Sequence, residues 1–286
     1  MFDTNHTAVA EFIMYGLGQY LLLGLSCAGQ ALSRPSCTEP KVKVVNGSYS
    51  GMHSREYKQD FFLGMPFAKV CSFRPFRLPL WHSTRSREEQ ADAQKPPKRF
   101  TVAESLDEKW DGVRDAKEYS RHCIGFGADS EPYELSEDCL YINVIRPEGL
   151  NDTADLPVAF WIHGGGLFGG GAPDVRYNLS FIVQQSVEMG TPMIGVSTNY
   201  RLSAFGFLNS KEAVDAGIAN MGFRDQRLAL QWVQENIAAF GGSPDKVTIW
   251  GESAGAESVT AQVLAYNGIL LIQTLTHNPG LTSSRS

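Results

Sequence analysis

The sequence lacks a hydrophobic run long enough to cross a lipid bilayer, which takes about 20 residues. The apolar run from Phe12 to Leu25 is too short. There is no internal repeat, which argues against a solenoid or a propeller. Acidic residues outnumber basic ones, and the net charge of −6 argues against nucleic acid or an anionic membrane as the main partner. What remains is a chain of 286 residues, 43% apolar and 20% charged, typical of a globular protein with one core.

Metal-binding patterns are missing as well. No cluster of histidine, cysteine or carboxylate residues has ligand spacing, so the sequence predicts neither a metal site nor a cofactor.

The N-terminus has several features of a secretion signal. Small residues at Gly29 and Ala31 follow the apolar run and offer a signal-peptidase site, so residues 1–31 are predicted to be a signal segment. Acidic residues and no lysine or arginine precede the run, and a start at Met14 would shorten the leader without adding a basic residue. The alternative is a buried helix of the mature fold. Three glycosylation acceptors, at Asn46, Asn151 and Asn178, agree with a secreted, extracellular protein without a stable membrane anchor.

Apolar runs of strand length recur along the chain. They lie at 60–68, 140–147, 156–164, 191–200 and 246–250, and the later ones lack polar alternation, as strands buried on both faces do. Between the last two, residues 224–242 repeat Leu230, Val233, Ile237 and Phe240 at helical spacing and end in two glycines. This order of strand, helix and strand predicts a parallel crossover connection, and therefore an α/β fold with a mostly parallel sheet.

Two segments do not fit this pattern. Residues 70–94 have no apolar period and are rich in arginine, serine and proline, and a loop of that length is uncommon inside a domain. Residues 269–286 join an apolar run to a polar end.

The stretch KVTIW-GESAG-AESVTAQVLAY, residues 246–266, predicts a strand, a tight turn and a helix around Ser253. This is the context in which G-x-S-x-G presents a nucleophilic serine. Gly251 and Gly255 leave room where the strand and the helix nearly touch, and the positive end of the helix lies under the developing charge. A second motif, HGGG at residues 163–166, follows a predicted strand directly. Its glycines let backbone N–H groups turn toward an oxyanion. Each such donor stabilises the transition state by about 3–4 kcal/mol. The alternatives are a flexible turn or a phosphate cradle, but no Lys-Ser/Thr of a P-loop follows.

These motifs resemble the type B carboxylesterase and lipase family, which includes the cholinesterases and has the α/β-hydrolase fold. Further matching pieces are FLGMPFA (62–68), SEDCLYINVIRP (136–147), NYRLSAFGFL (199–208) and, most densely, residues 221–259. The sequence of these segments is most similar to that of secreted fungal members. The resemblance implies that residues 32–268 are the N-terminal part of such a domain, with the later strands missing.

By this resemblance Ser253 is the nucleophile, and the amides of Gly165, Gly166 and Ala254 form the oxyanion hole. Cys123 and Cys139 match the family's first disulfide, and closing a loop of about 15 residues contributes about 3 kcal/mol. Glu137 is expected to pair with the arginine of an Arg-Phe dipeptide, here Arg99-Phe100. Glu252 either lines the floor of the site or has a structural role; it cannot be the acid of the triad.

No residue is found for the acid and the base of the triad. In this fold the histidine comes last, and His277, the only histidine after Ser253, lies in a context unlike the family. His163 belongs to the oxyanion loop, where packing is the expected role. The chain is therefore expected to be an incomplete or misread version of a longer enzyme, with residues 70–94 as a retained intron, and its central strand 246–250 is expected to become an edge.

The function predicted from these residues is hydrolysis of a small-molecule or lipid carboxylic ester through an acyl-enzyme. The short, acidic loop between Cys123 and Cys139 favours an esterase over a lipase. The alternatives are a catalytically silent, cholinesterase-like binding protein and a non-functional truncated product. The sequence does not fix the oligomeric state.

Overall fold

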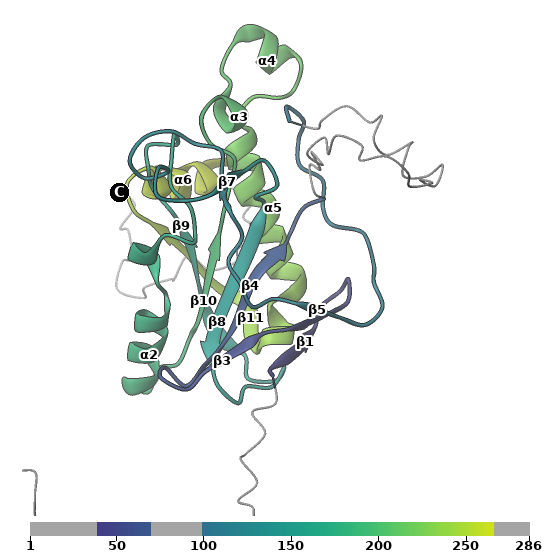
Figure 1. Ribbon diagram of the computed structural model, residues 1–286, viewed down its shortest axis with the longest axis vertical. Coiled ribbons are helices and arrows are strands. Elements are labelled where there is room, and N and C mark those ends of the chain that lie inside the picture. The colour runs from purple at the N-terminus through teal and green to yellow at the C-terminus, as the bar shows by residue number, and fades with distance from the viewer. Residues whose placement is uncertain (1–38, 70–98, 266–286) are drawn as a thin grey trace, which may run out of the picture. The chain divides into compact units, whose positions relative to one another are not determined.

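The computed structural model describes residues 39–69 and 99–265 (Figure 1). The chain divides into two units, Met1–Cys37 and Thr38–Ser286, and every described residue belongs to the second. The predictions for residues 1–31, 70–94 and 269–286, which include His277, lie outside the described residues.

A six-stranded sheet forms the centre of this unit, in the order β11-β9-β10-β8-β4-β3. Its strands are β3 (Met52–Ser54), β4 (Gln59–Pro66), β8 (Tyr141–Pro147), β9 (Leu156–Ile162), β10 (Ile194–Thr198) and β11 (Gly242–Gly251). The last five coincide with the five apolar runs, so the strand predictions are confirmed. Smaller sheets contain β1 (Lys41–Lys43), β2 (Ser48–Ser50) and β5 (Val113–Asp115), and β6 (His122–Cys123) with β7 (Leu135–Ser136).

The sheet is mixed rather than mostly parallel. Strands β9, β10 and β11 pair in parallel, whereas β10 with β8, β8 with β4, and β4 with β3 pair antiparallel. The α/β class is confirmed, but the prediction of a mostly parallel sheet is wrong for the described strands of this sheet, since fewer of their pairings are parallel than antiparallel. A tight turn joins β3 to β4, and such a turn can connect only antiparallel neighbours.

Helical crossovers connect the parallel strands. Helix α2 (Ser180–Glu188) with the short η1 (Val175–Tyr177) lies between β9 and β10. Between β10 and β11 lie α3 (Ser203–Phe207), α4 (Lys211–Asp215), α5 (Met221–Asn236) and η2 (Ile237–Phe240). Helix α6 (Ala254–Leu264) follows β11. The observed helix α5 therefore begins three residues before the predicted start at residue 224. The last turn of the predicted helix is the 3-10 helix η2, which is followed by Gly241 with φ 86°.

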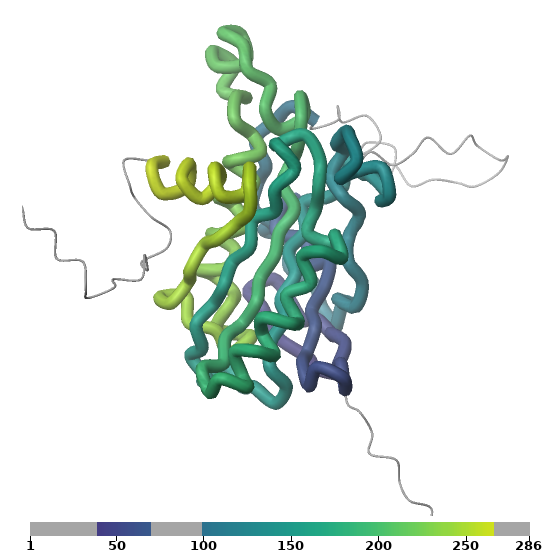
Figure 2. Tube along the Cα trace, turned by 90° about the vertical axis from the view of Figure 1, so that its left-hand side faces the viewer, coloured from purple at the N-terminus to yellow at the C-terminus, as the bar shows by residue number. Residues whose placement is uncertain are grey.

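Helices cover both faces of the sheet. On one face, Leu179 and Val183 at α2 pack with Trp161 in a small apolar cluster. On the other face, the four residues predicted to line the helix are at most 1% exposed and join the main core: Leu230, Val233, Ile237 and Phe240. Figure 2 shows α6, in yellow, near the ends of the strands, and it contacts β11 and β9.

Strand β11 is an edge of the described sheet, as predicted, because it pairs only with β9 among the described strands. Ile249 and Trp250 near its end are half-buried. No helix within the described ranges is both long and apolar enough to cross a membrane.

The glycosylation acceptors differ in accessibility. Asn46 is 8% exposed, and its side-chain amide donates hydrogen bonds to the carbonyls of Leu106 (2.7 Å) and Glu108 (3.1 Å). A glycan would replace one of the two hydrogens on this nitrogen and break at least one of these bonds, so the folded geometry argues against Asn46, which stays a prediction. Asn178 is half-buried and Asn151 is exposed; both remain predictions.

Candidate active site

Ser253 lies in the sharp turn between β11 and α6. Its backbone has φ 52° and ψ −122°, in a region that residues other than glycine avoid. Such a conformation costs about 1–3 kcal/mol and persists only where the surroundings enforce it. The side chain is exposed at the N-terminus of α6.

Close packing of β9, β11 and α6 enforces this turn. A Cβ at Gly255 would lie 2.1 Å from the carbonyl oxygen of Ile162, and a Cβ at Gly251 would lie 2.6 Å from the same atom. No side chain fits at either position. The expected close approach of strand and helix at these glycines is confirmed.

The glycine-rich loop, residues 163–171, reaches Ser253 from the neighbouring strand. The parallel register pairs Gly251 with Ile162, so the loops after β11 and β9 leave the same end of the sheet. A Cβ at Gly164 would lie 3.2 Å from the Cβ of Ser253 and 2.5 Å from a carboxylate oxygen of Glu252. The two motifs that were found separately in the sequence are therefore in contact.

Backbone N–H groups at this junction are available to a ligand. Gly165 and Gly166 have φ values of 96° and 63°, which only glycine adopts easily. Within residues 39–69 and 99–265, the N–H groups of Gly165, Gly166 and Ala254 donate no hydrogen bond to the protein. Ala254 also begins α6, whose N-terminus carries partial positive charge. This arrangement can receive an anionic oxygen.

His163 packs beneath the glycine-rich loop. Its Nδ1–H donates to the carbonyl of Gly164 (2.9 Å), its ring stacks on Tyr200 at 4.3 Å, and the Tyr200 hydroxyl donates to the His163 carbonyl (2.8 Å). Burial lowers the pKa of His163 to about 4, so the ring is neutral at pH 7. These contacts support the packing role expected from the sequence.

The other described histidines contact groups other than Ser253. His122 is buried against Gly171 and stacks on Tyr133 at 4.0 Å, and burial lowers its pKa. His53 pairs with Asp60 beside β8. Among the described residues, no histidine is hydrogen-bonded to Ser253. The assignment of the base stays open.

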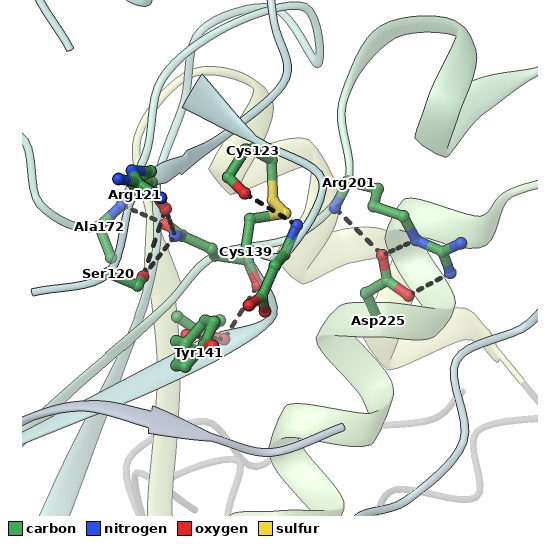
Figure 3. The surroundings of a disulfide bond; sticks show 12 residues. Ser120, Arg121, Cys123, Cys139, Tyr141, Ala172, Arg201 and Asp225 are labelled. Carbon is green, nitrogen blue, oxygen red and sulfur yellow. Dashed lines mark hydrogen bonds and ion pairs between the residues drawn. A yellow bond between two sulfur atoms is a disulfide. The ribbon is translucent and has the colours of Figure 1, made fainter. Parts of the chain in front are cut away.

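Two further predicted pairs are formed. Cys123 and Cys139 make a disulfide (Figure 3). Arg99 makes a two-pronged ion pair with Glu137, at 3.0 and 2.5 Å. Glu252 is exposed, and its carboxylate lies beside Gly164, which leaves both of its expected roles open.

Sequence reasoning missed three residues that support the site. Asn199 is 1% exposed and bonds to Ala172 directly after the glycine-rich loop. Asp174 is 2% exposed and pairs with Arg176. Nothing in the sequence marks these residues except their position after a buried strand or a glycine run.

Comparisons with known proteins place this geometry in a wider group. A profile described as "Carboxylesterase family" matches residues 90–274, more than half of the chain and beyond the boundary predicted at Gly268. The protein "Secreted lipase 1" of Botryotinia fuckeliana (strain B05.10) is 54% identical over 46% of this chain and 23% of its own length. The "Inactive carboxylesterase-like protein VdtD" of Byssochlamys spectabilis is 41% identical over 48% of this chain and 24% of its own length.

A solved structure described as "PNB esterase" superposes with a TM-score of 0.65 and 33% identity, covering 83% of this chain and 43% of that one. The chain thus spans about a quarter of the curated relatives that it matches and less than half of this solved structure.

Proposed function

The chain belongs to the carboxylesterase family, and we propose on that premise that it forms part of a secreted serine hydrolase that cleaves carboxylic esters. Ser253 is the nucleophile, and the N–H groups of Gly165, Gly166 and Ala254 are the oxyanion hole. No metal or cofactor takes part.

In the proposed reaction, the Ser253 hydroxyl attacks the acyl carbon and gives its proton to a general base. The carbonyl oxygen becomes an oxyanion between the three N–H groups, each of which is typically worth 10²–10³ in rate. When the intermediate collapses, the bond to the alcohol breaks and the alcohol leaves with the proton. Water then attacks the acyl-enzyme through the same oxyanion and releases the acid.

One observation carries this proposal. An exposed serine is held at φ 52° against a loop in which the N–H groups of Gly165 and Gly166 donate to no group of the described chain. Strain at a nucleophilic side chain indicates a functional position, and the free donors lie where negative charge would develop.

The acid and the base are proposed to come from residues of the whole protein outside the described ranges, because the described histidines have packing or ion-pair roles. In a comparable enzyme, removing the base of the triad costs about 2 × 10⁶ in turnover. A polypeptide without these residues would retain the site geometry and little activity.

The substrate is proposed to be an ester with an apolar group. Phe126 and Phe168, on the two loops beside the site, are 62% and 63% exposed. The short acidic loop between Cys123 and Cys139 supports a soluble ester, whereas the relatives named lipases support a lipid ester. Comparing hydrolysis of p-nitrophenyl butyrate with that of emulsified triolein decides between the two.

Labelling with a fluorophosphonate probe tests the nucleophile. We expect the full-length protein to be labelled and the Ser253→Ala variant to be unlabelled. Ser105→Ala, which removes another exposed serine, is the matched control and should label normally. Equal labelling of the wild type and Ser253→Ala would refute the assignment.

A second candidate is a catalytically silent binding protein. It is favoured by the packing role of His163 and by the similarity to a relative named inactive. Binding of an ester analogue without labelling or turnover by the full-length protein would support this candidate.

A further inference from the structure

The disulfide loop, residues 123–139, runs along the glycine-rich loop. The N–H of Phe126 donates to the carbonyl of Phe168 at 2.9 Å, which ties the first turn of the disulfide loop to the middle of the glycine-rich loop. Gly169 approaches the same segment so closely that a Cβ there would lie 2.7 Å from the carbonyl oxygen of Phe126. The conformation of one loop therefore depends on that of the other.

The roots of both loops, at Arg121 and Ala172, lie close together (Figure 3). Both are bonded to Asn199, directly after β10. Its side-chain oxygen accepts a hydrogen bond from the Ala172 N–H at 2.8 Å. Its side-chain nitrogen donates to the carbonyl of Arg121 at 2.9 Å and to the Ser120 hydroxyl at 3.2 Å. Since Asn199 is 1% exposed, these bonds form a buried, fixed anchor.

A charged contact joins the two loops at the surface. Asp174 accepts hydrogen bonds from the Arg176 backbone N–H (2.9 Å) and side chain (2.6–3.0 Å). The N–H of Asp174 donates in turn to the carbonyl of Gly171, the last residue of the glycine-rich loop. Arg176 also pairs with Asp129 of the disulfide loop at 2.6 Å. A single guanidinium therefore bridges the end of one loop and the tip of the other.

We propose that Asp129 and Arg176 are positioning residues that latch the glycine-rich loop to the disulfide loop and so hold its N–H groups in place for the oxyanion. Neither residue touches the reacting atoms. The side chains of Arg176 and Asp129 are 57% and 40% exposed, and an exposed ion pair adds little to global stability. Its effect is therefore local, on a loop that is also held by the Asn199 anchor, by the Phe126 bond to Phe168 and by a bond from the Ser203 N–H to the Leu167 carbonyl (2.7 Å).

Hydrogen exchange within residues 163–171 tests the latch directly, in the full chain and without any assay of activity; the amides of Phe168 and Gly169, which donate to the Gly165 carbonyl, report it. We expect Asp129→Ala and Arg176→Ala to exchange about two- to five-fold faster in this segment, the range that the energy of an exposed pair allows. Asp129→Glu keeps the carboxylate and should restore slow exchange. Lys211→Ala breaks an exposed pair on α4, with Asp215, and should leave the segment unchanged.

Unchanged exchange at 163–171 in both alanine variants would overturn the proposal. So would faster exchange spread over the whole chain, because that result indicates a general loss of stability.

The kinetic consequence rests on the proposed function. In the active full-length protein, the two alanine variants should lower kcat about two- to five-fold with KM unchanged, because an oxyanion contact acts in the transition state and not in the bound substrate. A raised KM with unchanged kcat would contradict the role in positioning. If the wild type hydrolyses no ester, the proposed function fails, while the exchange experiment still decides whether the latch exists.

Discussion

Gly255 packs against the carbonyl oxygen of Ile162 so closely that a Cβ on this glycine would lie 2.1 Å from that oxygen. Both partners are backbone, so neither can move without displacing α6 or β9. We expect Gly255→Ala to lower the free energy of unfolding by about 1–3 kcal/mol, the usual cost of overpacking. Urea denaturation of the purified chain measures this change.

Glu257→Ala is the control for this substitution. Glu257 is exposed in the first turn of the same helix, and surface changes usually stay within about 0.5 kcal/mol. Equal stability of Gly255→Ala and the wild type would show that Gly255 and the Ile162 carbonyl are not in close contact.

The neutral His163 makes stability depend on pH. Burial lowers its pKa from 6.5 to about 4, so between these values the unfolded chain binds the proton and the folded chain does not. Stability must therefore fall as the pH decreases from 6.5 toward 4. From pH 7.5 to pH 5, this group alone should remove about 2 kcal/mol.

His163→Phe keeps an aromatic ring against Tyr200 and removes the titrating group. Its loss of stability between pH 7.5 and pH 5, measured by urea denaturation, should be about 2 kcal/mol smaller than that of the wild type. An identical pH dependence in both proteins would mean that His163 is protonated in the fold or solvated.

The sequence predicted the strands and the main helix well because buried apolar runs and helical periodicity depend on neighbours in the chain. It also located Ser253 and the glycine-rich loop, since each motif is continuous. The direction in which neighbouring strands pair was harder to predict, because β8 and β4 are apolar runs whose sequences look the same for parallel and antiparallel pairing. Asn46 looked like a surface acceptor, yet its amide is buried against carbonyls some 60 residues away in sequence. The contacts of Arg176 depend on a loop about 50 positions earlier, which no local pattern reveals.

The disulfide between Cys123 and Cys139 should contribute to stability through the unfolded chain. The two residues are 16 positions apart, and closing a loop of that size is worth about 3 kcal/mol in the chain-entropy account. We expect the double variant Cys123→Ala/Cys139→Ala to lose about that amount in urea denaturation. The wild type with a reducing agent should match the variant. A variant as stable as the oxidised wild type would show that the bond does not form in solution.

Phe168 gives the proposed hydrolase a testable preference for acyl length. Its side chain is 63% exposed on the glycine-rich loop, beside Phe126, so a substrate chain can bury it. Covering about 60 Å² of apolar surface is worth about 1.5 kcal/mol, or roughly tenfold in kcat/KM. Phe168→Ala should therefore reduce kcat/KM for p-nitrophenyl octanoate about tenfold and leave that for the acetate nearly unchanged. Phe181→Ala, which removes an equally exposed phenylalanine from α2, should alter neither. If Phe168→Ala lowers kcat/KM equally for the octanoate and the acetate, the ring supports the loop and does not contact the acyl chain.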